Sequence, residues 1–133
     1  MLFSPLFVFH YAKIWTNQYL RRVIFIKEKE NKSFDGIIQA GPFKLDIIVR
    51  RAYKPDGTNL PLTPKEFTLL LILSQNEGRF VDSKYLYEKI WETPMSNDSN
   101  ALKTTINRLR AKIAGSGWSI GWLRGEGYIF EKE

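Results

Sequence analysis

The feature that most constrains the fold of this chain is an amphipathic segment, residues 99–113, with one basic face. Its apolar residues recur at helical spacing and would line one stripe that faces a core. They are Leu102, Ile106, Leu109 and Ile113. The residues between them include four cations and no acid. At about 1.5 Å per residue the helix would be roughly 22 Å long, enough to lie in a DNA major groove, although a solvated surface face is the alternative interpretation.

The composition limits the chemistry that this chain can perform. At 133 residues it has room for one domain with a single core, and its net charge of +6 favours an anionic partner, nucleic acid or an acidic membrane surface. The absence of cysteine excludes disulfides, thiol catalysis and cysteine-ligated zinc. A single histidine, His10, provides neither a metal cluster nor an obvious triad. We therefore expect no catalytic residue, no metal site, no cofactor and no enzymatic activity.

Residues 1–40 are expected to form an N-terminal arm or linker, distinct from a domain that spans residues 41–133. Polar residues interrupt the apolar start of the chain, and its positive charges follow the apolar run. This pattern argues against a membrane span or a secretory signal and predicts a cytoplasmic protein. Within the arm we expect a helix near 11–22, a strand at 23–26 and a linker at 27–35. The arm would pack on the domain or on a partner chain, with a membrane-surface helix as the alternative.

From residue 41 the pattern predicts short strands followed by helices. A turn with proline at its second position, residues 55–58, separates strand-like segments. Thr63, Pro64 and Glu66 form the signature of a capping box, so a helix should begin there and end near residue 77.

A second helix, capped by Asp82 or Ser83, should end at Trp91 and lead into a loop at 92–98. After the basic helix, residues 118–123 and 128–131 are expected to pair as a hairpin around a Gly-rich tip. The order of sheet, three helices and hairpin is α+β.

Five sequence motifs in this order resemble the C-terminal DNA-binding domain of OmpR/PhoB-type two-component response regulators. The resemblance covers about residues 41–133 and implies a winged helix-turn-helix: an N-terminal four-stranded antiparallel sheet, a three-helix core and a C-terminal β-hairpin wing. The motifs are LTPKEF at 62–67, GRFV at 78–81, the helix from Leu86 to Trp91, INRLRAK at 106–112 and RGEGY at 124–128.

The resemblance implies sequence-specific binding of double-stranded DNA for transcription regulation. The third helix would enter the major groove, with Arg108 on bases and Arg110 on phosphate, and the wing residue Arg124 would enter the adjacent minor groove. Trp91 would approach the DNA backbone or pack in the core. The family positions that face the groove or its rim correspond in this chain to Asn100, Thr104 and Asn107. The chemistry of the residues agrees, since Arg and Asn can read guanine and adenine edges, while Lys103, Arg110 and Lys112 can hold phosphates.

Three residues depart from the family pattern. Trp122 stands where a small polar residue is usual, Ile129 where an arginine is common, and Glu92 where a glycine often follows the tryptophan. Forty upstream residues cannot hold the receiver domain of such regulators. The chain would therefore be a truncated regulator or a stand-alone one with a different arm.

The expected partners follow from the same resemblance. Two copies would form a homodimer on repeated half-sites, and the loop 92–98 would contact RNA polymerase, as in some family members. The alternative function is a winged-helix protein-interaction module that does not bind DNA. The acid-free face of the third helix favours DNA, because an interaction module would more often expose apolar residues there.

Overall fold

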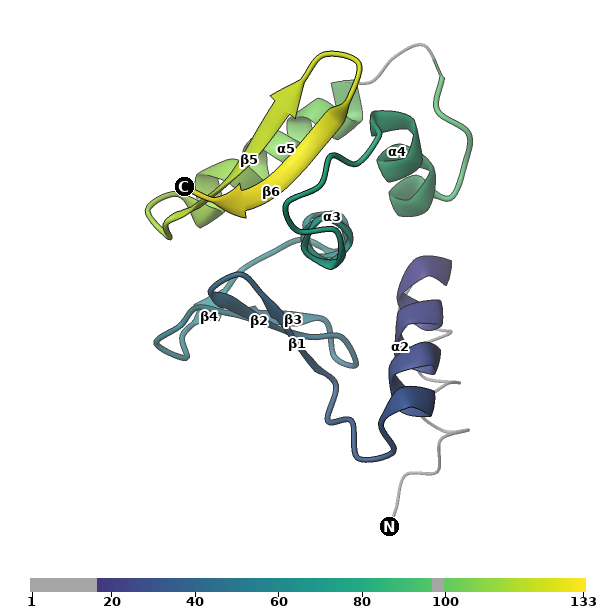
Figure 1. Cartoon of the computed structure of the whole chain (residues 1–133), viewed down its shortest axis with the longest axis vertical. Helices are drawn as coiled ribbons and strands as arrows, with labels where there is room; N and C mark the ends of the chain where they lie inside the picture. Colours follow the sequence, from purple (N-terminus) through teal and green to yellow (C-terminus); the bar gives the residue numbers. More distant parts are fainter. Residues whose placement is uncertain (1–16, 97–99) are drawn as a thin grey trace.

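The computed structural model describes residues 17–96 and 100–133 and contains two antiparallel sheets and a set of packed helices (Figure 1). This architecture confirms the predicted α+β class, with the sheet first and the hairpin last. The elements in chain order are α2 Gln18–Glu30, β1 Ile37–Ala40, β2 Phe43–Asp46, β3 Arg51–Tyr53, β4 Asn59–Leu60, α3 Pro64–Gln75, α4 Ser83–Trp91, α5 Asn100–Ile113, β5 Trp118–Leu123 and β6 Gly127–Lys132.

The N-terminal sheet is a meander of four antiparallel strands in the order β1-β2-β3-β4. Ala40 pairs with Phe43 across the first turn, so the sheet begins at Ile37, before the boundary expected at residue 41. Alternation places Phe43 and Leu45 in the core, as period-two strands require. The turn predicted at 55–58 is present, since the Gly57 N–H donates to the Lys54 carbonyl at 2.9 Å.

Helix α3 lies at the centre of the molecule, between the N-terminal sheet and the layer made by α5 and the hairpin (Figure 1). The expected capping box is confirmed: the Thr63 hydroxyl accepts from the Glu66 N–H, and the Glu66 carboxylate accepts from the Thr63 N–H. The spacing of Phe67, Leu70, Leu71 and Ser74 predicts a single inward stripe, but every residue from Glu66 to Leu73 is buried. A helix that is covered on several sides has no exposed face to reveal its orientation.

Helix α2 corrects the expected structure of the N-terminal region. The predicted strand at 23–26 and the start of the predicted linker at 27–35 are wrong, because one helix continues to Glu30. Leu20 and Ile24, one turn apart, are fully buried in the same core as α3, and this packing favours the helix. Residues 11–16 of the helix predicted near 11–22 lie outside the described residues.

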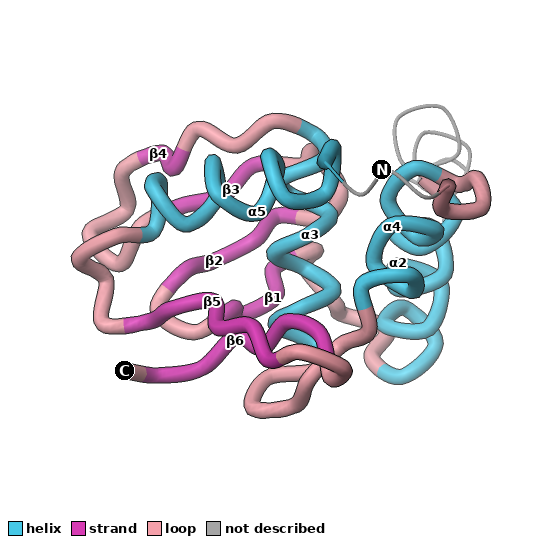
Figure 2. The backbone as a smooth tube through the Cα atoms, turned by 90° about the horizontal axis from the view of Figure 1, so that it is seen from above, coloured by secondary structure: helices cyan, strands magenta, loops and turns pink. Residues whose placement is uncertain are grey.

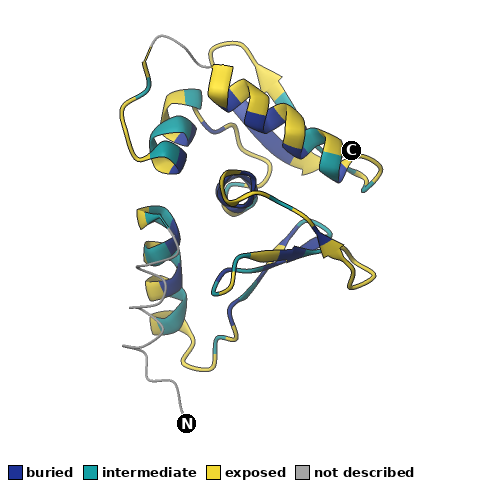
Figure 3. Ribbon diagram, turned by 180° about the vertical axis from the view of Figure 1, so that it is seen from behind, coloured by how far each residue is buried: buried dark blue, intermediate teal, exposed yellow. Residues whose placement is uncertain are grey.

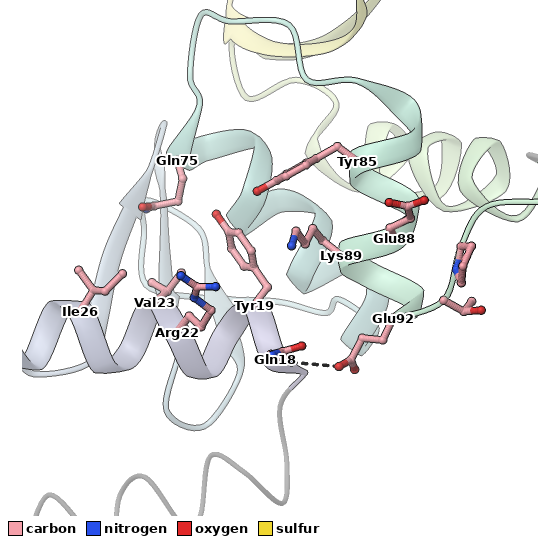
Figure 4. Close-up of a pocket in the computed structure, with 12 residues that line it drawn as sticks. Gln18, Tyr19, Arg22, Val23, Ile26, Gln75, Tyr85, Glu88, Lys89 and Glu92 are labelled. Carbon is pink, nitrogen blue, oxygen red and sulfur yellow. Dashed lines mark hydrogen bonds between the residues drawn. The ribbon is translucent and has the colours of Figure 1, made fainter.

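Helices α2 and α4 lie on the same side of α3 (Figure 2), contact each other and cap each other at adjacent ends. The Asn17 side chain, which caps α2, also donates from Nδ2 to the Lys89 carbonyl near the end of α4, at 2.7 Å. In return, the Gln18 N–H at the start of α2 donates to Glu92 Oε1 at 3.2 Å (Figure 4). Each contact satisfies a backbone group that a helix end leaves unpaired.

This reciprocal cap accounts for the departure at Glu92. Glu92 ends α4 in the left-handed conformation, with φ of +57°, which glycine adopts at lower cost. Glycine would leave the α2 N–H group without its carboxylate, and a negative charge is favourable at a helix N-terminus. The contact with α2 therefore compensates for the backbone strain.

We expect Glu92→Ala to destabilise the protein by about 1 kcal/mol, because the strained backbone stays while the cap is lost. Glu92→Gly should be less destabilising, since it loses the cap but also relieves the strain. Urea unfolding followed by circular dichroism measures both values. A Glu92→Ala protein as stable as the wild type would mean that the contact between α2 and α4 contributes nothing.

The cleft between α2 and α4 has a volume of about 750 Å³ and is lined by charged and aromatic side chains (Figure 4). Tyr19 lies in it beside Tyr85. Burial, with a smaller contribution from Tyr85, raises the pKa of Tyr19 to about 12. Its hydroxyl therefore stays protonated at neutral pH, and Tyr19 packs as a neutral aromatic residue between the two helices.

Candidate nucleic-acid interface

Helix α5 has one buried and one exposed face (Figure 3). The predicted apolar stripe is confirmed, since Leu102, Ile106, Leu109 and Ile113 are all buried. Thr105 joins them, with its hydroxyl donating to the Ala101 carbonyl at 2.9 Å. The exposed polar residues recur at spacings of three, one, three and one, so they share one face. They are Asn100, Lys103, Thr104, Asn107 and Arg108.

Two cations on this face are available to an anion. Lys103 and Arg108 are exposed, and within residues 17–96 and 100–133 neither makes an ion pair or a hydrogen bond. The first turn of α5 carries no acidic residue. The face therefore presents uncompensated positive charge beside amide and hydroxyl groups, a combination that suits a phosphate-lined groove.

Arg110 joins α5 to the hairpin at the edge of this face. Its Nε donates to the Ile120 carbonyl at 2.9 Å, and its Nη1 donates to Asn107 Oδ1 at 3.1 Å. Its guanidinium carbon lies 5.9 Å from the centre of the Tyr128 ring. Burial raises the pKa of Tyr128, and the charge of Arg110 opposes this rise. Arg110 thus connects α5 to both strands of the hairpin and orients the Asn107 side chain.

Lys112 is paired with a buried carboxylate. Its Nζ donates to Glu66 Oε1 at 2.5 Å, and the Glu66 side chain is only 2% exposed, against 31% for Lys112. This oxygen also belongs to the capping box of α3. The structure therefore places Lys112 against the start of α3, and its charge is compensated, unlike the charges of Lys103 and Arg108.

Trp91 is half-buried at the end of α4 and packs against the core. Its ring stacks on Tyr87, with centroids 4.6 Å apart and planes inclined by 7°. The ammonium group of Lys65 lies 5.5 Å from the centre of the Trp91 ring. Lys65 leaves no local signal in the sequence, because its contact with Trp91 joins two different helices.

Arg124 lies in the turn at the tip of the hairpin, where it is exposed. The Glu126 N–H donates to the Leu123 carbonyl at 2.9 Å and closes the turn. In the part of the chain that the structure describes, no side chain pairs with Arg124. Its guanidinium is therefore available at the tip of the hairpin. The turn at 114–117, which joins α5 to β5, lies at the opposite end of the strands.

The hairpin is attached to the rest of the domain by a third extended segment. The Val81 N–H donates to the Tyr128 carbonyl at 2.7 Å, and the Tyr128 N–H donates to the Val81 carbonyl at 2.9 Å. The Gly78 N–H also donates to the Phe130 carbonyl. These hydrogen bonds attach the hairpin to the segment that joins α3 to α4, and β6 also contacts α3.

These features define a winged helix-turn-helix domain, with α4 and α5 as the helical pair and β5–β6 as the wing. The chain matches the family model described as "Transcriptional regulatory protein, C terminal" over residues 57–130. It therefore belongs to this family, the DNA-binding domain of OmpR/PhoB-type response regulators. Membership confirms the predicted function class, sequence-specific DNA binding in transcription regulation.

Known relatives share the domain but are longer than this chain. Regulatory protein VanRB of Enterococcus faecalis is 42% identical over 77 residues, which cover 58% of this chain and 34% of that protein. Transcriptional regulatory protein CusR of Escherichia coli K12 is 30% identical over 95 residues, 70% of this chain and 41% of that protein. The chain thus spans between a third and a half of the length of these relatives.

Solved structures share the fold. The DNA-binding domain of CpxR from E. coli has a TM-score of 0.64 and 29% identity, covering 72% of this chain and 96% of that one. The RstA DNA-binding domain of Klebsiella pneumoniae, solved in complex with the RstA box, has a TM-score of 0.62 and 23% identity, covering 71% and 96%. Among the described residues, no helix is long and apolar enough to cross a membrane.

Proposed function

We propose that α5 enters the major groove of duplex DNA and that Arg124 enters the adjacent minor groove. The observation that carries this proposal is the acid-free face of α5, on which Lys103 and Arg108 are exposed and uncompensated. Arg108, near the middle of the helix, would read bases through its bidentate fork. Lys103 would bind phosphate and contribute no sequence preference.

The neighbouring residues would complete the readout. Asn100 and Asn107 can pair with adenine edges, and Thr104 can present its methyl group to thymine. Arg110 and Lys112 would support binding through position, the first by linking α5 to the wing and the second by anchoring α5 on α3. Trp91 would contact the DNA backbone. Lys65, whose ammonium group lies over the Trp91 ring, is the adjacent cation.

The proposed assembly is a regulator that acts in the cytoplasm as two copies on DNA. A single domain should bind weakly, and tight binding would need repeated half-sites about 10–11 bp apart. The loop 92–98 would offer a contact to RNA polymerase, although residues 97–98 lie outside the described residues. The existence of an RstA domain solved with its DNA box supports a DNA-binding use of this fold.

Arg108→Ala and Lys103→Ala should affect DNA binding in different ways. Arg108→Ala is expected to cost on the order of 1–3 kcal/mol and to relax the base preference at one position. Lys103→Ala should weaken all sequences alike and reduce the slope of log affinity against log salt by about 0.9. Fluorescence anisotropy of labelled duplexes, across a salt series and with a library-selected site, measures both.

Lys44→Ala is the matched control, because Lys44 is an exposed cation on β2 and α3 separates this sheet from α5 (Figure 1). Its loss should leave affinity nearly unchanged. Equal behaviour of Arg108→Ala and Lys103→Ala on selected and random DNA would refute the assignment of bases and phosphates. Absence of any binding at about 50 mM salt would favour the protein-interaction module instead.

A further inference from the structure

We propose that Trp122 packs against the deoxyribose wall of the minor groove beside Arg124, as an apolar contact of the wing; this inference rests on the proposed function. Trp122 is 56% exposed, a large apolar surface to leave in water. Its neighbour Leu123 is 51% exposed, so the end of β5 presents two large apolar side chains directly before the arginine of the turn.

The strand register places the indole on the side of the hairpin that faces α5. Trp122 pairs with Tyr128, and directly paired residues in an antiparallel ladder share a face. Tyr128 is the residue over whose ring the Arg110 guanidinium lies, and Ile120, two residues before Trp122, also faces the core. Trp122 therefore continues this face outward, past the point where the core ends.

The same register directs Leu123 to the opposite face of the hairpin. Residues alternate along a strand, so Leu123 shares its face with Gly121 and with Ile129, the partner of Gly121. Ile129 is buried but does not belong to the main core cluster, as expected for that other face. Leu123 and Trp122 are thus adjacent and similarly exposed, yet only Trp122 lies on the α5 side.

The electrostatics of the wing favour an apolar contribution. The turn carries Arg124 and also Glu126, so its formal charges cancel. With one arginine in the turn and a carboxylate two residues away, this wing gains less from counterion release than a more basic wing would, and an apolar contact would add to its affinity. The sugars that line the minor groove present C–H surface that an apolar ring can cover, and minor-groove proteins use both inserted arginines and apolar side chains. The indole of Trp122 is the side chain positioned for this contact.

The test compares Trp122→Ala, Trp122→Phe and Leu123→Ala on a labelled duplex of about two helical turns. Trp122→Ala should weaken binding about tenfold, with the log–log salt slope unchanged because no charge is removed. Trp122→Phe should restore most of the affinity, and Leu123→Ala should bind like the wild type. Acrylamide quenches tryptophan fluorescence, and the difference in quenching between the wild type and Trp122→Phe reports on Trp122. This difference should become smaller when duplex is added.

The outcomes separate this inference from the proposed function. Unchanged affinity for Trp122→Ala, in a protein that still loses binding with Arg108→Ala, would overturn the Trp122 contact and leave the α5 assignment standing. Equal losses for Trp122→Ala and Leu123→Ala would also overturn it, since the contact predicts only one active face. Circular dichroism melting curves of all variants confirm that folding is intact. If the wild type itself does not bind duplex, both proposals fail.

Discussion

Gly127→Ala is expected to destabilise the protein by about 3–5 kcal/mol and to detach the wing from the rest of the domain. A Cβ at this position would lie 2.1 Å from the Val81 carbonyl oxygen and 2.7 Å from its carbon, both backbone atoms. Gly127 also has a φ of +110°, which side chains rarely adopt. Relief would require separating Val81 from β6, with loss of the two hydrogen bonds between Val81 and Tyr128.

Gly125→Ala is the control for this substitution. Gly125 lies in the adjacent turn with φ of +83°, but a Cβ there would meet nothing within 4 Å. It should cost only about 1–2 kcal/mol of backbone strain. Urea unfolding of both variants, with amide hydrogen exchange at Val81 and Tyr128, measures the difference. If the two variants were equally stable, the close approach of Val81 would not constrain the wing.

Lys112→Met is expected to destabilise the protein by about 2–4 kcal/mol, because it leaves the buried Glu66 carboxylate without its cation. Among the described residues, Glu66 Oε1 would then keep only the Thr63 N–H as a partner. The residual exposure of the lysine side chain, 31%, allows some water to replace it, which keeps the cost below that of a fully buried pair. Denaturant unfolding measures the loss.

Two companion variants test the cause of this loss. Lys103→Met, an exposed cation of the same helix, should change stability by less than about 0.5 kcal/mol. Adding Glu66→Gln to Lys112→Met should recover part of the stability, since the uncompensated charge is removed while an acceptor remains. DNA affinity measured on the folded fraction then shows whether Lys112 also contacts phosphate. A stable Lys112→Met protein would contradict the structural role of the pair.

The elements that could be predicted were those with strong local signals. The capping box at Thr63 and Glu66 uses groups three residues apart, so its signature is written in adjacent sequence. The period of Leu102 and its apolar companions predicted α5 and its buried face. The Gly-rich tip and flanking apolar residues predicted the hairpin. Family resemblance, and not spacing alone, joined these pieces into a winged helix-turn-helix.

The elements that could not be predicted depend on contacts between distant residues. Val23 to Ile26 has the composition of a strand, yet it is helical because Leu20 and Ile24 find a core to pack on. The all-round burial of α3 depends on elements from both ends of the chain. Likewise, the four cations counted on the basic helix are not equivalent, since Lys112 meets Glu66 and Arg110 meets the Ile120 carbonyl.

Local sequence is enough to predict where the helices cap, which face of α5 is apolar and that positive charge gathers on the other face, because these properties arise within one or two helical turns. The packed fold is needed to tell which of those charges remain uncompensated, why Glu92 replaces a glycine and on which side of the wing Trp122 lies. Each of these depends on a partner from another element: Glu66 for Lys112, Gln18 for Glu92 and Tyr128 for Trp122. Side-chain pairing across the fold has no period along the chain, so only packing reveals it.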